Sequence, residues 1–416
     1  MSKRTYRATH FHRVDWTDLA RRIEGGRAVF AIDAAKREFV GVLMNEDRQG
    51  LKTIKWRHPR DTRALVERLS ELAAAPVEAV LEPTGTYADA LVYQLRQAGL
   101  AVYRMPPKRV HDAREIYDGV PSMHDGKSAY VIARLHLEKV DSRWNSDDEQ
   151  RRALAAQSSQ LAFCRDQAQR LHNRLEARLA RHWPEAEELI GLDTKSLLRL
   201  LAAYGSPAAV AADAAGARAL LARVGGHFLA QDKIEALMAS AHTTIGVPCV
   251  AAEAAVIREL AEELLALAAQ RRRLKRALRA AGEQDGCISG QRESVGAVTA
   301  AVIYAELGDA RDYPDATRYA KAAGLNLKEH SSGEHQGLLR LTKRGPGIVR
   351  LYLYFAVLRW ISQAGPARRW YEAKVARDGG VTTKAIGALM RKLVRALWHV
   401  GQGECFDETR LFAETA

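Results

Sequence analysis

Residues 27–56, RAVFAIDAAKREFVGVLMNEDRQGLKTIKW, alternate short apolar runs with charged turns. Apolar runs of this length, rich in Val, Ile and Phe and bounded by turn residues, are typical of β-strands. The pattern predicts three short strands that follow one another as a meander.

After the meander, helix and strand signals alternate. An amphipathic helix is predicted in DTRALVERLSELAAA (61–75), and a buried strand in VEAVLEP (77–83). A helix at 86–100, a strand at 101–106 and a helix at 108–119 are predicted next. Residues 27–145 should therefore form an α/β domain with helices packed on a mixed sheet. Residues 1–26 are a basic N-terminal extension whose fold the sequence leaves open.

The remainder of the chain has a helical composition. Residues 147–181 place Leu, Ala, Arg and Gln at helical spacing, and 251–281 form a second long amphipathic stretch. The second stretch has an apolar stripe near heptad spacing, consisting of Val256, Leu260, Leu264, Leu267, Leu274 and Leu278. This stripe predicts a long helix or coiled coil, which an oligomer and an intramolecular helix pair would satisfy equally.

Glycine and proline punctuate the Ala-rich stretch between these two long segments, which predicts several short helices in 182–249. We therefore divide the later chain into a helical linker at 146–284, with a coiled coil and inserted helices, and a mainly α-helical domain at 285–416.

The charge balance points to a polyanionic partner. The 416 residues include 63 Lys and Arg against 50 Asp and Glu, a formal net charge of +13. Nucleic acid is the most frequent partner of such a chain, and a membrane surface or unspecific ribosome-like binding is the alternative. No apolar run is long enough to span a membrane, and residues 1–16 lack the apolar core of a signal peptide. The four scattered cysteines contain no CxxC pair, which predicts a reducing cytoplasm rather than a disulfide framework or zinc knuckle.

Acidic residues follow two of the predicted buried strands. Asp33 interrupts VFAIDAA and Glu82 ends AVLEPTG, where a charge among apolar neighbours is costly unless it binds something. Asp125, in MHDGKSAYVIARL, lies at a predicted helix start. Asp and Glu supply the hard oxygen ligands that Mg²⁺ requires, and two such ions can bracket a phosphodiester. This order of strands and acids resembles the nuclease arrangement of ribonuclease H and RuvC. Individually, Asp33 and Glu82 could be simple strand-end acids and Asp125 a helix cap.

A polar segment near the C-terminus, KEHSSGEHQG (328–337), holds two adjacent serines. Ser and Gly are common in turns, so Ser331-Ser332-Gly333 is interpreted either as a turn or as a turn that presents a nucleophile. A serine hydroxyl needs activation or a stabilised transition state to react with a phosphate. Cationic and hydrogen-bonding side chains that could supply this are Lys328, His330, His335, Lys343, Arg344 and Arg350. Lys343 and Arg344 equally suit the simple role of binding backbone phosphates.

The motifs resemble those of one family in order and along most of the chain. The motifs AIDAAK (31–36), EPTGTY (82–87) and MHDGKSA (123–129) are similar to the acidic motifs of the DEDD-type Piv/MooV transposases of the insertion sequence 110/1111 group. The later family motifs have counterparts in SVGAVTAAVIYAELGD (294–309), AAGL (322–325), SSG (331–333), TKRG (342–345) and IGALMRKL (386–393). Together they cover the chain from Val29 to about Phe406.

The resemblance implies a RuvC-like domain, a coiled-coil linker and a C-terminal transposase domain with a nucleophilic serine. By position that serine is Ser332, with Ser331 as the alternative, and Asp33, Glu82 and Asp125 are the acids that hold Mg²⁺ or Mn²⁺. Such enzymes are understood to form a covalent phosphoserine link with DNA, in sites assembled across subunits. The resemblance also implies DNA recombination through circular intermediates, a structured guide RNA encoded beside the element, and a dimer or tetramer. It places the protein in the prokaryotic cytoplasm, associated with the nucleoid.

The sequence departs from this family pattern at two positions. The fourth acid is expected three residues after Asp125, one helical turn along the same face, but Ser128 occupies this position as a weaker ligand. The metal site could then work with three acids and water, recruit Asp118 or Asp112, or have decayed. The family's glycine hairpin reads ESVG (293–296) here, so that Gly296 remains without the first glycine.

Three functional hypotheses follow from these patterns. A transposase or site-specific recombinase would use the three acids together with Ser332. A RuvC-like nuclease would cut DNA without a covalent adduct and would tolerate the loss of Ser332. A non-catalytic remnant would bind DNA or RNA with strong salt dependence and would not cut.

Overall fold

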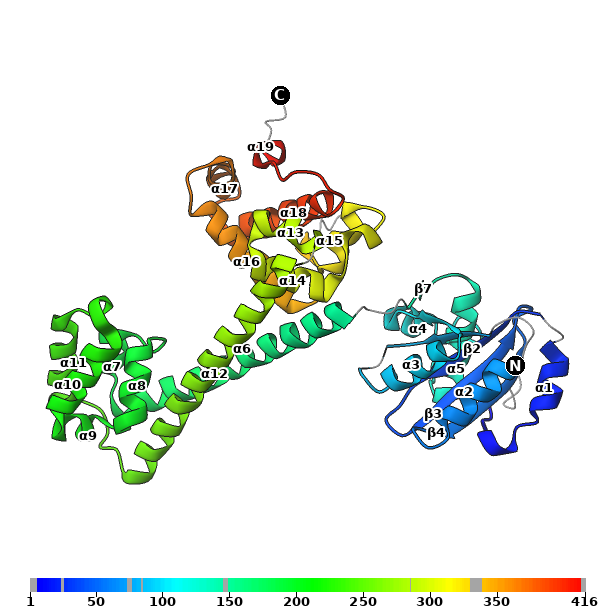
Figure 1. Cartoon of the computed structure of the whole chain (residues 1–416), viewed down its shortest axis with the longest axis horizontal. Coiled ribbons are helices and arrows are strands. Elements are labelled where there is room, and N and C mark those ends of the chain that lie inside the picture. Colours follow the sequence, from blue (N-terminus) through cyan, green and yellow to red (C-terminus); the bar gives the residue numbers. More distant parts are fainter. Residues whose placement is uncertain are drawn as a thin grey trace. The chain divides into compact units, whose positions relative to one another are not determined.

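The computed structural model of the chain describes residues 6–23, 26–72, 77–83, 85–144, 149–284, 286–329 and 339–412 (Figure 1). Two compact units divide the chain: Met1–Ser146 and Asp147–Ala416. The first is an α/β unit and the second is almost entirely helical, so the predicted change of architecture along the chain is confirmed.

The first unit is built on a seven-stranded mixed sheet in the order β1-β4-β3-β2-β5-β6-β7. The predicted meander is confirmed, since β2 (Ala28–Asp33), β3 (Glu38–Asn45) and β4 (Gly50–Arg57) pair antiparallel in sequence order. On the other side of β2, β5 (Glu78–Leu81) and β6 (Ala101–Arg104) continue the sheet in parallel. The short β7 (Ser142–Arg143) closes that edge antiparallel to β6. The strand β2 is therefore central, which leaves the residue at its end between two neighbouring strands.

Helices cover both faces of this sheet. Successive side chains of β2 alternate between two cores, with Phe30 and Ile32 on one face and Val29 and Ala31 on the other. The first face packs against α1 (Trp16–Ile23), α2 (Thr62–Glu71) and α3 (Asp89–Gln97). The second face packs against α4 (Pro107–Asp112) and α5 (Asp125–Leu137). Because both faces are buried, β2 is apolar from Ala28 to Ile32, and the cost of placing the charge of Asp33 at its end is correspondingly high.

The N-terminal lead-in is part of this unit. Its β1 (Thr9–His10) pairs parallel with β4, and η1 (Phe11–Arg13) and α1 place Phe11, Leu19 and Ile23 in the core. Tyr6 lies against the start of α5, with its ring edge-on to those of His124 and Tyr130. The basic lead-in therefore packs beside the first turn of α5.

The second unit is organised by two long helices, α6 (Glu149–His182) and α12 (Ala251–Gln284), which lie side by side in opposite directions (Figure 1). The predicted apolar stripe follows their contact, with Leu260, Leu264 and Leu278 buried. The apolar stripe is therefore buried in the contact between two antiparallel helices of the same chain.

A small helical bundle joins the end of α6 to the start of α12, as the short-helix prediction for 182–249 requires. Its helices are α7 (Glu185–Ile190), α8 (Lys195–Tyr204), α9 (Pro207–Ala212), α10 (Ala214–Gly225), η2 (Gly226–Phe228) and α11 (Gln231–Thr243). These helices share a hydrophobic core with Leu175 and Leu179 of α6 and Ile257 and Leu260 of α12.

The C-terminal helices pack around the other end of the helix pair. They comprise α13 (Gly286–Val295), α14 (Ala297–Leu307), η3 (Ala310–Asp312), α15 (Ala316–Ala322), α16 (Gly347–Ile361), α17 (Pro366–Arg377), α18 (Thr382–Gly401) and α19 (Glu408–Leu411). Leu154 and Leu161 of α6 and Leu278 of α12 enter their core. A two-stranded ribbon, β8 (Leu327–Lys328) with β9 (Arg340–Leu341), separates α15 from α16. In the described residues, no helix is both long and apolar enough to cross a bilayer.

Candidate active site

Two of the predicted acids end neighbouring strands. Asp33 is the last residue of β2, and Glu82 directly follows β5. These strands run parallel with Ile32 opposite Leu81, so the two acids follow paired residues at the same edge of the sheet. Both side chains are half-buried. The sheet therefore positions two carboxylates beside one another where each alone would be costly.

The third acid, Asp125, is the first residue of α5 and is exposed. Its charge raises the pKa of the Asp33 carboxyl, so α5 brings it to the same edge of the sheet. Ser128, one turn further along α5, hydrogen bonds to the Asp33 side chain. Asp33 therefore interacts with Asp125 and Ser128 of α5 and with Glu82 after β5, although Ser128 contacts an acid rather than replacing one. In the described part of the chain, the three carboxylates do not form a close group of metal-ligating atoms.

The electrostatics of this acidic cluster oppose full ionisation. Burial, followed by the charge of Asp125, raises the pKa of Asp33, while the hydrogen bond from Ser128 acts in the opposite direction. Burial and the charge of Asp33 likewise raise the pKa of Glu82. Like charges held close together in a partly buried site favour the protonated forms unless a cation neutralises them.

The start of α5 is fixed by neighbouring groups. The His124 ring accepts the N–H of Lys127, which caps the helix. Lys127 is buried and donates through Nζ to Asp118 at 2.8 Å, and Tyr6 donates to the same carboxylate at 3.2 Å. Asp118 is therefore committed to Lys127 and Tyr6, and Asp112 forms an exposed ion pair with Lys108. With these partners, neither Asp118 nor Asp112 is a good substitute for the acid expected at the position of Ser128.

The donor set fits a hard divalent cation. Asp33, Glu82 and Asp125 supply only carboxylate oxygens, and these are the atoms that Mg²⁺ and Mn²⁺ prefer. Ser128 would not bind the ion itself. Its hydroxyl would orient the carboxylate of Asp33 through a hydrogen bond.

Ser331 and Ser332, together with His330 and His335, lie outside the described residues, but the ribbon that flanks them is described. Leu327 pairs with Leu341, and the N–H of Lys343 donates to the carbonyl of Gly324 at 3.0 Å. A Cβ at Gly345 would lie 2.3 Å from the carbonyl oxygen of Ala322, so glycine permits this close approach. The AAGL and TKRG motifs therefore meet and close the base of the segment that contains the serines.

The cations predicted around this segment fall into two groups. Lys328, Lys343 and Arg344 are exposed. Arg350 is half-buried, and its guanidinium donates to the carbonyl oxygens of Ala323 at 3.3 Å and Gly345 at 2.8 Å. Lys328, Lys343 and Arg344 thus offer their charges to solvent, while Arg350 links the two motifs at the base.

The ESVG motif forms a corner between helices. Helix α13 ends at Val295, Gly296 has a φ of 83°, and α14 begins at the next residue. A positive φ of this size favours glycine, which explains its presence there.

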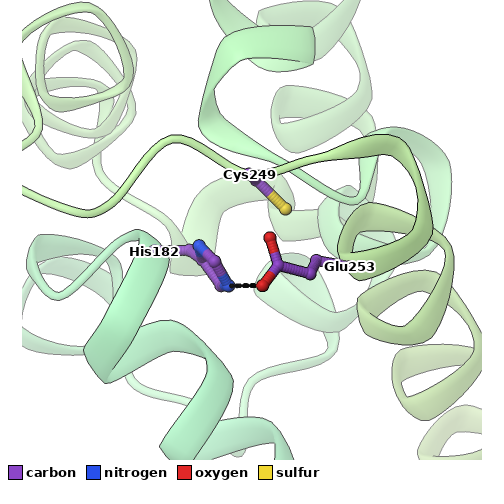
Figure 2. Close-up of side chains that lie close together, drawn as sticks. All are labelled: His182, Cys249 and Glu253. Atoms are coloured by element: carbon purple, nitrogen blue, oxygen red, sulfur yellow. Dashed lines mark ion pairs between the residues drawn. The ribbon is translucent and has the colours of Figure 1, made fainter.

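A second group of potential ligands was not predicted. His182, Cys249 and Glu253 of the second unit place one ligand atom each within 4.8 Å of the others (Figure 2). The spacing Cys-x₃-Glu at the start of the long helix was the one sequence signal, and His182 is far from it in the chain. Its nitrogen and sulfur donors do not suit Mg²⁺, so it is distinct from the acidic cluster.

Two family models match the chain. Residues 30–184 match a model described as transposase, and residues 291–372 match the model of the transposase IS116/IS110/IS902 family. The acidic cluster lies in the first matched region, and the ribbon with its serine segment lies in the second. Residues 185–290 lie between them.

Curated relatives from three bacteria are similar to the chain. A protein described as "Insertion element IS110 uncharacterized 43.6 kDa protein" from Streptomyces coelicolor is 28% identical over 84% of this chain and 87% of its own length. A "Probable family 20 transposase" from Pseudomonas aeruginosa is 32% identical over 39% of this chain and 49% of its own length. The "Transposase for insertion sequence element IS1111A" from Coxiella burnetii is 31% identical over 25% of this chain and 29% of its own length.

Proposed function

We propose that this chain, whose matched domains and relatives support an insertion-sequence transposase of the IS110 family, cuts and rejoins DNA with a carboxylate–metal site and a serine nucleophile. The observation that carries the proposal is that Asp33, at one edge of the sheet, interacts with both Glu82 and Asp125. The central β2 with its antiparallel meander and parallel β5 supports a ribonuclease H-like or RuvC-like reading of this unit.

The acidic residues would hold Mg²⁺ or Mn²⁺. When bound, such an ion polarises a phosphodiester and stabilises the oxygens that attack and leave. The contribution of the chain is to position three oxygen ligands on rigid elements, with Asp33 and Glu82 on paired strands and Asp125 on α5. Ser128 would keep the carboxylate of Asp33 oriented through its hydrogen bond.

Ser332 would act as the nucleophile, with Ser331 as the alternative. Its oxygen would bond to a DNA phosphorus while the bond from phosphorus to one sugar oxygen breaks. The serine proton passes to a base or water, and the departing sugar oxygen takes up a proton. Lys328, Lys343 and Arg344, exposed at the base of this segment, would bind the phosphates of the strand. Arg350 would hold the base together through its two carbonyl contacts.

The partners follow from the same proposal. DNA is the partner that a transposase implies, and the net charge of +13 suits it. A structured guide RNA is a further part of the proposal. So is a dimer or tetramer, since the acids belong to the first unit and the serine to the second. Function would take place in the prokaryotic cytoplasm, at the nucleoid.

The test is a strand-transfer assay on element-end DNA with Mg²⁺ and the flanking RNA. Wild type should yield protein covalently attached to DNA, Ser332→Ala should yield none, and Ser331→Ala should retain the adduct. Ser362→Ala is a matched control, because that exposed serine contacts only the carbonyl of Arg359 among the interactions described for its hydroxyl.

Other outcomes separate the competing functions. Cutting without any adduct would contradict the serine mechanism and favour a RuvC-like nuclease. DNA binding without metal-dependent cutting in wild type would favour a non-catalytic remnant. An adduct that survives Ser332→Ala but not Ser331→Ala would move the nucleophile by one residue.

A further inference from the structure

The second unit contains a group of three side chains whose chemistry the proposed transposase reaction does not use. His182 is the last residue of α6, Cys249 lies just before α12, and Glu253 lies in the first turn of α12. Figure 2 shows the three side chains converging, and their ligand atoms all lie within 4.8 Å of one another. Cys249 and Glu253 fall in residues 185–290, outside both matched regions.

The orientation of the His182 ring follows from its partners. Its side chain is fully buried, and Nδ1 lies 2.8 Å from the carbonyl oxygen of Val247. A carbonyl can only accept, so Nδ1 carries a proton, and Nε2 is the ring nitrogen that could offer a lone pair to an ion. Nε2 is buried and has no hydrogen-bond partner among the described residues. A histidine whose second ring nitrogen is fixed by a carbonyl is the usual form of a metal ligand.

The other two side chains direct their donor atoms toward the same point. Glu253 uses Oε2 to accept the N–H of Val250 at 3.1 Å, while Oε1 lies 3.5 Å from Nε2 of His182. The half-buried Cys249 makes a weak contact from Sγ to the carbonyl of Val250 at 3.7 Å. Sγ of Cys249 and Oε1 of Glu253 therefore both lie on the side that faces His182, and Oε1 is also 3.8 Å from Nε of Arg181.

The backbone around these side chains is closely held. The N–H of Val247 donates to the carbonyl of Arg181 at 2.8 Å. Gly246 passes over His182 so closely that a Cβ there would lie 2.2 Å from the carbonyl oxygen of His182. Glu185 binds the hydroxyl of Thr244 at 2.7 Å and the N–H of Ile245 at 3.0 Å. The loop that delivers Cys249 is thus anchored to the end of α6 independently of any ion.

We propose that His182 Nε2, Cys249 Sγ and the Glu253 carboxylate bind one Zn²⁺ ion or a similar transition-metal ion, with water in the fourth position. Nitrogen, sulfur and carboxylate oxygen are the three donor types of zinc sites, whereas a thiol is unsuited to Mg²⁺. On binding, the thiol of Cys249 loses its proton to solvent, and thiolate and carboxylate together neutralise the two charges of the ion. Arg181 Nε, 3.8 Å from Glu253, makes a plain ion-pair network the alternative.

The position of the site indicates a structural role. It joins the end of α6 to the start of α12, the two points where the inserted bundle of 183–250 leaves and re-enters the long helix pair. An ion there would close the base of that bundle and resist separation of the two helices. This inference does not depend on the DNA chemistry, so the two can fail separately.

The experiment is a Co²⁺ titration of the full-length protein after removal of metals by a chelator. Wild type should bind one Co²⁺ with a thiolate-to-cobalt absorption band, and Zn²⁺ should displace it. Cys249→Ser should lose the band, while Cys405→Ser should keep it, because Cys405 is an exposed cysteine of the same unit. His182→Asn should weaken binding by at least about 100-fold, since even partners of metal ligands contribute about 10–100-fold.

A second measurement uses the wild-type protein and therefore needs no variant to fold. Zn²⁺ should protect Cys249 from alkylation, as mapped by mass spectrometry, while Cys405 reacts equally with and without the ion. Equal labelling of Cys249 in both conditions, or a Co²⁺ band that persists in Cys249→Ser, would overturn the proposal. The three side chains would then be an ion-pair network with a neighbouring thiol.

Discussion

The two groups of potential metal ligands, one in each unit, are built on different principles. The acidic cluster consists of three carboxylates on paired strand ends and a helix start, in which like charges raise the pKa values of Asp33 and Glu82. The His182 group contains one carboxylate, one thiol and a buried imidazole whose Nε2 lies 3.5 Å from the Glu253 carboxylate and has no hydrogen-bond partner among the described residues. The first therefore suits a hard ion that neutralises repulsion, and the second suits a borderline-soft ion that accepts lone pairs.

Burial and charge therefore act together with donor type in deciding which ion each group can hold. Metal-binding measurements should distinguish the two groups, because each group should bind its own kind of ion and lose it only when its own residues are substituted. If one substitution affected both ions, the assignment of two distinct sites would be wrong.

The largest expected effect is that of Asp33→Asn on DNA cutting. The substitution keeps the size of the side chain but removes one of three charges that would hold the ion. We expect cutting to fall by about 1000-fold, because metal stabilisation of the reacting phosphate contributes several kcal/mol. The measurement is the rate of Mg²⁺-dependent cleavage of element-end DNA.

Asp112→Asn is the matched control for this substitution, since Asp112 is exposed and paired with Lys108 in the same unit. Its rate should stay within about twofold of wild type, as is usual for surface positions. Asp33→Asn should leave Co²⁺ binding at the His182 group unchanged. Near-wild-type cutting in Asp33→Asn would remove the acidic cluster from the mechanism.

A buried histidine of the first unit, His136, has partners at both ring nitrogens. His136 faces Asp141 through Nδ1 and Glu78 through Nε2, the latter at 3.2 Å. Burial lowers the pKa of His136, but the hydrogen bonds and charges of Asp141 and Glu78 outweigh it and raise the pKa above 6.5. Glu78 is also bound by Arg27 and Tyr103, and its pKa is lowered from 4.5. No ring nitrogen is left for a metal, so His136 should act in stability alone.

His136→Gln should accordingly destabilise the first unit by about 3 kcal/mol, as expected when one partner of a buried ion pair is removed. A raised histidine pKa stabilises the fold below the ordinary value of 6.5 and loses this contribution as pH rises through the folded value. The lowered pKa of Glu78 stabilises the fold above pH 4.5, and this stabilisation is lost as the pH falls through the folded-state pKa. The deficit should therefore be largest between these two values and should shrink at alkaline pH.

Hydrogen exchange of the amides of β5 and β6, measured across this pH range, would report the change within the first unit. His111→Gln is the control, because His111 is exposed beside Asp112. A deficit in His136→Gln that does not vary with pH would show that packing, rather than charge, is the contribution of His136.

Much of the first unit could be predicted because its signals are local. The apolar runs of β2 and β5 identify strands, and the acid at or just after the end of each marks one edge of a sheet. The prediction that Asp33, Glu82 and Asp125 act together rests on their order in the chain and on the resemblance, whereas the contact between Ser128 and Asp33 requires coordinates. The two-residue β1 carries no periodicity, so its pairing with β4 could not be found.

The second unit was harder to predict because its decisive contacts are distant in the chain. The stripe with Leu260 and Leu264 predicted a helix partner, but the pattern is the same for a partner in the same chain and in another. His182 meets Cys249 only because α12 returns beside α6. Arg350 resembles a phosphate ligand in sequence, since its backbone carbonyl partners leave no trace there.

The smallest expected effect concerns Ser128→Asp, which restores a fourth carboxylate to the acidic cluster. The new charge would lie one turn after Asp125 and beside Asp33, where Ser128 now donates a hydrogen bond. Added negative charge should lower the Mg²⁺ concentration for half-maximal cutting by about tenfold, the scale on which metal surroundings tune affinity. Ser128→Asn, which alters the hydroxyl without adding charge, separates the two contributions. An equal shift in both variants would mean that the serine hydroxyl matters and the charge does not. Cutting that appears only in Ser128→Asp would mean that three carboxylates cannot hold the ion.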